Sequence, residues 1–134
     1  MVPDDFQIPQ TLQTEHFLLR PLTVHDVVKD FDAMISRGAV TEGLTLEQNL
    51  IDLGWHQKEF QRRSSFAYTV MAPDEERCLG CVYIYPSPTR GADVDVSMWV
   101  RGDRPDLDPI LFETVRRWIG EAWCFRRVNY PGRT

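Results

Sequence analysis

The residues best suited to chemistry occupy every second position of a strand-like stretch: Asp95, Ser97, Trp99 and Arg101. Because alternate side chains of a β-strand point to the same face, the stretch predicts a valine- and methionine-rich core face and an opposite polar face. If the polar face lines a cleft, its carboxylate, hydroxyl, indole and guanidinium would form the wall of a substrate site. If that face is open to solvent, the same row of side chains is ordinary surface.

The connector that follows, residues 102–108 with the sequence GDRPDLD, leads from this strand into an amphipathic helix. At such a junction in an α/β domain, backbone N–H groups without partners can bind an anion. The helix is predicted to start with Asp108 as its N-cap and Pro109 at its first position. A small-molecule site is expected at this junction, although the connector is rich in aspartate.

The other candidate ligands and catalysts are isolated. Cys78 and Cys81 have CxxC spacing, but no second cysteine or histidine pair accompanies them, so we expect buried, reduced thiols and no metal site. Their offset of three predicts opposite faces of one strand, and Gly80 between them suggests a bulge or a close backbone approach. His56 stands alone on a predicted helix and is interpreted as a surface or packed residue.

The composition is that of one soluble globular domain, residues 1–134, with a loosely held N-terminal arm at 1–13. A net charge of −5 argues against nucleic acid as the main partner, since phosphate binding needs a basic surface. The arginine pairs at 116–117 and 126–127 are interpreted as solvated. The sequence shows neither a secretion signal nor an apolar run long enough for a membrane span, and its odd cysteine count suggests reduced thiols, which together predict a cytoplasmic protein.

The elements that position the candidate site follow from the periodicity of the apolar residues. Strands are predicted at 17–22, 66–71, 78–85, 94–101 and 125–130, and helices at 24–36, 46–61 and 109–122. Residues 78–85 are apolar on both faces, which is typical of a central strand covered by helices on each side. Val28 and Ile35 are predicted to face the core from the first helix, and Leu46 and Leu50 from the second.

Three stretches in the same order resemble the GNAT-type acyl-CoA N-acyltransferases, in particular the branch that modifies ribosomal proteins. Residues 14–26, TEHFLLRPLTVHD, are similar to the family's opening pattern TERLxLRPLTxxD. Residues 79–85, LGCVYIY, resemble its third strand, and residues 95–100, DVSMWV, resemble its fourth, EIGYWV. The resemblance covers residues 14–130. It implies an α+β fold with a mixed, mostly antiparallel sheet and helices on both faces, shortened by the family's last helix and two strands.

The resemblance also implies an activity, the transfer of an acyl group from acetyl-CoA or another acyl-CoA to an amine, without a metal. In this family the fourth and fifth strands splay apart, and the pantetheine arm pairs with the main chain of the fourth strand. The matching positions here are Met98, Trp99, Val100 and Arg101. Asp95 matches the family's acidic general base, although its side chain is one methylene shorter.

The loop expected to bind the cofactor diphosphate departs from the family pattern, in which glycines let the phosphates approach the backbone. Gly102 and Arg104 fall in the matching loop, but Pro105 removes an N–H donor and two nearby aspartates add negative charge. The guanidinium groups of Arg101 and Arg104 could compensate, by a different solution from a nest of backbone amides.

The sequence therefore supports two interpretations: an N-acyltransferase, and a catalytically inactive GNAT-shaped binding or interaction module that does not use acetyl-CoA. For the enzyme, the acceptor is expected to be a small-molecule or peptide amine. Neither nucleic acid nor a membrane is expected as a partner. A chain that stops at the fifth strand of this fold leaves an unpaired sheet edge, which predicts a homodimer whose partner strands complete the sheet.

Overall fold

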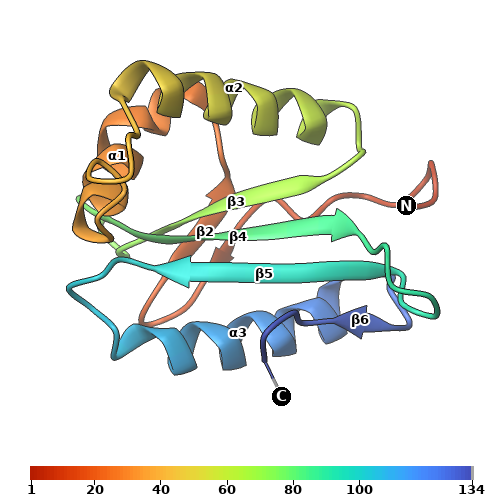
Figure 1. The fold of residues 1–134 in the computed structure, drawn as a ribbon. Helices are drawn as coiled ribbons and strands as arrows, with labels where there is room; N and C mark the ends of the chain where they lie inside the picture. The colour runs from red at the N-terminus through yellow and green to blue at the C-terminus, as the bar shows by residue number, and fades with distance from the viewer. Residues whose placement is uncertain (134) are drawn as a thin grey trace.

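The computed structural model describes residues 1–133 and contains a curled six-stranded sheet with helices on both faces (Figure 1). The strands lie side by side in chain order, and neighbouring strands are antiparallel except for the last pair, which is parallel. Helices α1 and α2 cover one face, and α3 covers the other. The predicted α+β fold with a mixed, mostly antiparallel sheet is confirmed.

The bounds of the central elements agree with the predicted ones to within a few residues. The elements are β1 (Leu12–Gln13), β2 (Leu18–Pro21), the short 3-10 helix η1 (Val24–Asp26), α1 (Val27–Ser36), α2 (Leu46–Gln61), β3 (Phe66–Met71), β4 (Cys78–Pro86), β5 (Val94–Val100), α3 (Leu107–Ala122) and β6 (Val128–Asn129). After β6, the described residues add no further helix or strand.

The main core lies between the sheet and α3. Alternate strand residues such as Tyr68, Val82 and Val96 meet Leu111 and Trp118 of α3, and all of them are buried. The rings of Tyr68 and Trp118 pack edge to face with their centroids 4.9 Å apart. Because hydrophobic stabilisation scales with the apolar area removed from water, this layer supplies the larger share of it.

The opposite face is covered by α1 and α2 and is packed by smaller residues together with buried polar groups. Asp26 accepts two hydrogen bonds, of 2.8 and 3.1 Å, from the guanidinium of Arg20. Asn49 of α2 donates a 3.0 Å hydrogen bond to Asp30 of α1. These bonds satisfy polar groups that burial would otherwise leave unpaired. The bond between Asn49 and Asp30 also links α2 to α1.

The predicted inner sides of α1 and α2 are partly wrong. Val28 and Ile35 of α1 are 70% and 49% exposed, and Leu46 and Leu50 of α2 are also exposed. In α1 the residues buried toward the sheet are instead Asp30 and a small alanine. The hydrogen bond between Asn49 and Asp30 satisfies the polar groups that this rotation buries. A hydrophobic pattern alone cannot foresee the rotation because it assigns polar residues to the outside.

The two cysteines of the CxxC stretch lie on the same side of the sheet, so the prediction of opposite faces is wrong. Cys78 packs against α1, and Cys81 packs with Leu53 of α2. The pairing of β3 with β4 shifts by one residue at this point, which restores the side-chain direction. The close approach predicted at Gly80 is confirmed, since a Cβ there would lie 2.1 Å from the Trp99 carbonyl oxygen. Both thiols are free and buried, as predicted.

Residues 1–13, expected to form a loosely held arm, pack against the core. Phe6 stacks near Trp123 with ring centroids 5.8 Å apart, and Ile8 also contacts the main core. The guanidinium of Arg63 donates hydrogen bonds to two carbonyl oxygens of this segment, those of Pro3 and Phe6.

Candidate functional site

Strand β5 has a partner on its outer side only at its first two residues. Val94 pairs with Val128 and Asp95 with Asn129, after which β6 ends. The predicted final strand at 125–130 is therefore reduced to two residues. Beyond that pair, residues 96–100 have no strand beside them among the described residues, and Figure 1 shows β6 lying against only the start of β5. We refer to this unpaired edge of residues 96–100 as the free edge.

The register of β5 against β4 shows which main-chain groups point to the free edge. The pairing is uniform along the whole strand, and the Arg101 N–H donates to the Leu79 carbonyl at 2.9 Å. Since antiparallel strands alternate between residues that bond the neighbour and residues that point away, the Trp99 main chain also bonds β4. The N–H and C=O groups of Met98 and Val100 point to the free edge.

Arg101 is only 3% exposed. Its guanidinium donates to the Cys78 carbonyl and to Asp32 of α1, both at 3.0 Å, and to Asp103 at 2.7 Å. These contacts tie β4, α1 and the connector together, so the side chain of Arg101 acts as a structural cross-link.

The aspartates of the connector are all ion-paired with arginines. Asp103 lies 2.7 Å from Arg101 and 2.8 Å from Arg77. Asp106 and Arg104 form a bidentate pair, and Asp108 forms another with Arg133. These pairings hold the pKa values of the three aspartates below their usual range. The negative charge that the sequence places here is therefore balanced by the fold.

The start of α3 differs from the prediction. The helix begins at Leu107 with Asp106 as the N-cap residue, so the assignment of Asp108 as N-cap and Pro109 as first residue is wrong. The N–H groups of Leu107 and Asp108 already donate to carbonyl oxygens of the preceding turn, at 3.1 and 3.2 Å. The helix is thus started by a main-chain turn, and the Asp108 carboxylate is free to bind Arg133.

Gly102 packs against the end of α1. Its N–H donates to the Ser36 hydroxyl at 3.0 Å, and a Cβ at this position would lie 2.2 Å from the Ser36 carbonyl oxygen. A side chain here would force the connector away from α1. The glycine is therefore required for this packing, and its N–H already has an acceptor.

Asp95 lies at the base of the free edge, where β5 and β6 are still paired. Its Oδ1 atom accepts hydrogen bonds from the Ser87 hydroxyl at 2.5 Å and from the Asn129 amide at 3.0 Å. No described residue donates to its Oδ2 atom. Asp95 is half-buried and sits directly across from Tyr85 of β4, on the face that α2 covers.

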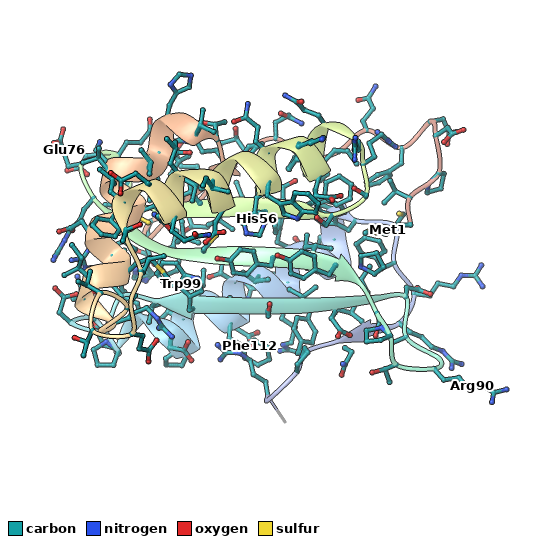
Figure 2. The ribbon with its side chains drawn as sticks, turned by 45° about the horizontal axis from the view of Figure 1, so that its top comes forward. Met1, His56, Glu76, Arg90, Trp99 and Phe112 are labelled. Carbon is teal, nitrogen blue, oxygen red and sulfur yellow. The ribbon has the colours of Figure 1, made fainter. Side chains whose placement is uncertain are left out.

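Three further side chains on this face were not singled out from the sequence as members of one site. His56 of α2 points toward β4 (Figure 2), with its Nδ1 atom 3.4 Å from the Tyr85 hydroxyl and its ring 5.1 Å from that of Tyr83. Tyr83 and Tyr85 stack with their ring centroids 5.9 Å apart, and the Trp99 indole donates to the Tyr83 hydroxyl at 3.0 Å. Burial lowers the pKa of His56, which therefore favours a neutral imidazole, and raises the pKa of Tyr85 to about 12.

Sequence reasoning also missed Arg37, the residue that ends α1. Its Nη1 atom donates to the Val100 carbonyl at 2.7 Å, and its guanidinium carbon lies 5.2 Å from the centre of the Trp99 ring. No sequence motif connects residue 37 with residues 99–100. Only the pleat of β5 and the docking of α1 bring them together.

A cavity of about 570 Å³ lies elsewhere, between α3 and the turn that joins β1 and β2. Its walls include His16, Ile110 and Trp118, and none of them comes from β5, β6 or the connector. Within residues 1–133, no set of three or more His, Cys, Asp or Glu side chains is placed to hold a metal ion. No helix in that range has the length and apolar character needed to cross a membrane.

No protein-family profile and no curated protein sequence matches the chain. Solved structures do match. A ribosomal-protein-S5-alanine acetyltransferase from Vibrio fischeri has a TM-score of 0.65 at 13% identity, over 85% of this chain and 69% of its own. A protein from Bordetella pertussis assigned to the GNAT acetyltransferases has a TM-score of 0.64 at 15% identity. The match covers 90% of this chain and 77% of the Bordetella chain. A ribosomal L7/L12 α-N-protein acetyltransferase in complex with coenzyme A has a TM-score of 0.64 at 11% identity. The match covers 81% of this chain and 67% of the acetyltransferase chain. The chain therefore has the fold of the GNAT acetyltransferases.

Proposed function

We propose that this protein is an N-acyltransferase that moves an acyl group from acetyl-CoA or another acyl-CoA to an amine. The observation that carries the proposal is the free edge of β5 beside a connector whose acidic charge is neutralised. The fold shared with solved acetyltransferases supports it, since one of them was determined in complex with coenzyme A. A binding module can also use an open strand edge, so the carboxylate of Asp95 beside that edge is what favours catalysis.

The residues of the free edge fit an extended acyl-CoA arm. The main-chain N–H and C=O groups of Met98 point outward and can pair with the amide groups of a pantetheine chain, as a neighbouring strand would. Trp99, Val100, Arg101, Gly102 and Arg104 remain the other predicted contacts, although the structure gives Arg101 and Gly102 packing roles of their own. The thioester would then lie toward the base of the edge, near Asp95.

Asp95 is proposed as the general base. Ser87 and Asn129 hold one carboxylate oxygen and orient the side chain, which leaves Oδ2 for an ammonium group. When Oδ2 takes a proton from the ammonium, the amine nitrogen gains the lone pair that attacks the thioester carbonyl. The carbon–sulfur bond then breaks, and the second proton that the nitrogen loses on forming the amide passes to the sulfur, which leaves as the free thiol. The neighbouring Tyr85 and His56 would form the wall against which the acceptor lies.

The acceptor class is proposed from the neighbours. Their names describe acetylation of ribosomal proteins, including the L7/L12 α-amino group. We propose a peptide or protein amine for this chain too, in the cytoplasm. We also retain the proposal of a homodimer in which the partner's strands complete the sheet along the outer side of β6 and leave the free edge open. A sedimentation coefficient of a monomer at micromolar concentration would contradict the dimer.

A thermal shift assay tests the proposed function directly. Acetyl-CoA at ~100 times its dissociation constant should stabilise the fold by about 2.7 kcal/mol and raise the melting temperature clearly. The absence of any shift with acetyl-CoA, longer acyl-CoAs and free CoA would favour the inactive module instead.

The same assay, combined with turnover, tests the role of Asp95. Asp95→Asn should lower kcat with a peptide amine by about 100-fold and leave the thermal shift nearly unchanged, because the amide keeps its hydrogen bonds but cannot accept the proton. Asp5→Asn, the same chemical change at an exposed residue of the N-terminal segment, serves as the matched control with near-normal turnover. Equal turnover of Asp95→Asn and the unchanged protein would remove Asp95 from the mechanism.

A further inference from the structure

The corner where β5, the connector and the end of α1 meet contains a guanidinium group that has no ion-pair partner within residues 1–133. Arg37 is held there by its hydrogen bond to the Val100 carbonyl and by its position over the Trp99 ring. The connector packs directly on the same segment, since Gly102 donates to Ser36. The guanidinium is therefore held beside the free edge, and its charge reaches Asp108 at the start of α3, where it helps Arg133 to lower the pKa of that carboxyl.

The other charges of this corner cancel in pairs. The paired carboxylates belong to Asp32, Asp103, Asp106 and Asp108, and the paired guanidinium groups to Arg77, Arg101, Arg104 and Arg133. Four negative and four positive groups leave no net charge. Among the described residues, no carboxylate lies within ion-pair distance of Arg37, so its positive charge is the surplus at this corner.

Most main-chain N–H donors of the corner are also engaged. The N–H groups of Leu107 and Asp108 donate to carbonyl oxygens of the connector, Gly102 donates to Ser36, and Pro105 has no N–H. Because few main-chain donors are left, an anion bound here relies mainly on side-chain donors. A guanidinium has five N–H donors in a planar fork that fits two phosphate oxygens, and Arg37 uses one atom, Nη1, on the Val100 carbonyl.

We propose that Arg37 binds the diphosphate of acyl-CoA, and that this side chain from α1 takes the place of the backbone amides that the connector lacks or already uses within the fold. The proposal rests on the proposed function, because it assigns a residue to the cofactor of that reaction. It differs from the sequence prediction, in which Arg101 and Arg104 supply the positive charge. Both of those side chains are ion-paired within the fold.

Calorimetric titration of the full chain with CoA, and an NMR titration with pantetheine, which lacks the phosphates, test the proposal. Arg37→Gln should weaken CoA binding about 10- to 100-fold, because a charge-assisted contact is lost, and should leave pantetheine binding within twofold. The CoA affinity of Arg37→Lys should lie between those of the unchanged protein and Arg37→Gln, since lysine keeps the charge but not the planar fork of donors. Arg62→Gln, an equal charge change at the exposed end of α2, serves as the control with unchanged CoA affinity.

The outcomes separate this proposal from the proposed function. If the unchanged protein binds no CoA, both fail. If it binds CoA and Arg37→Gln binds it equally well, only the role of Arg37 is overturned. An equal loss of CoA and pantetheine binding would also overturn it, because Arg37 would then act on the shape of the free edge and not on phosphate. Unchanged melting temperatures of the variants without ligand exclude loss of folding as the cause.

Discussion

The two faces of the sheet are built from different chemistry. The face covered by α3 is a continuous apolar layer in which Val96 and Leu111 are almost completely buried. The face covered by α1 and α2 holds small apolar clusters, the buried carboxylate of Asp30 and the half-buried rings of His56 and Tyr85. The first face stabilises the fold, and the second carries the polar groups of the proposed site, at a cost in stability.

Strand β5 belongs to both layers, and this explains why the candidate site lies along it. Its even-numbered residues anchor the strand on α3, while Asp95, Ser97 and Trp99 point to the face covered by α1 and α2. The apolar side can hold the strand in place although its outer edge is unpaired. The comparison predicts that substitutions on the two faces differ in the size, and even the sign, of their effect on stability.

The largest effect is expected in the α3 layer. Leu111→Ala should lower the free energy of unfolding by about 2–5 kcal/mol, because it removes buried methyl groups and leaves a cavity. Urea unfolding followed by circular dichroism measures the change. Leu50→Ala on the exposed side of α2 is the matched control, with an expected change below ~0.5 kcal/mol. Similar losses for the two variants would contradict the assignment of the main core.

The next largest effect is expected at Asp30, where a substitution should raise the free energy of unfolding by an amount that depends on pH. Burial raises the pKa of Asp30 to about 6, well above its ordinary value of 3.8. Asp30 in the folded chain therefore binds its proton more tightly than in the unfolded chain. Its stabilising contribution is complete below pH 3.8 and is lost as the pH rises through 6.

Asp30→Asn removes this dependence and keeps the hydrogen bond, since its amide oxygen can accept from Asn49. We expect a gain of about 2 kcal/mol at pH 7.5, because no charge is buried, and almost none at pH 4. Unfolding curves at the two pH values measure the difference, with Glu42→Gln as an exposed control. An equal gain at both pH values would show that the Asp30 carboxyl does not titrate as described.

The smallest effect on stability is expected from substitutions at Val96 and Ser97, neighbouring residues of β5 that point to opposite faces of the sheet. Val96→Thr places a hydroxyl in the α3 layer and should cost about 1–2 kcal/mol, because the group finds no partner there. Ser97→Ala on the opposite face should change stability by less than ~0.5 kcal/mol. Thermal unfolding of both variants measures the pair. A larger loss for Ser97→Ala would mean that the α2 face is packed as tightly as the α3 face.

Much of the fold could be predicted from the sequence because it rests on local patterns. The alternation of residues 94–100 and the apolar run of 78–85 each define a strand, and the three family-like stretches suggest their order. The faces of α1 and α2 could not be predicted, since Asp30 is buried by a partner nineteen positions away. The side of Cys78 could not be predicted either, because a bulge changes the direction of a side chain without changing the pattern.

The candidate site was predictable only in part. Asp95 and the free edge follow from the polar face and from the resemblance, but the same face contains His56 and Tyr85 because α2 lies over β4. Arg37 gives no signal in the sequence. Its part in the site depends on the packing of α1 against the connector.

The sequence by itself determined the strands, the helices, and the acidic, glycine-poor composition of the connector, because these depend on residue type and spacing. The tertiary structure decided what that composition means. Arginines that lie far away in the chain, such as Arg77 and Arg133, come within ion-pair distance of the connector aspartates only after folding. Electrostatic energy depends on distance in space and not on separation along the chain, so the charge of this corner is a property of the folded protein.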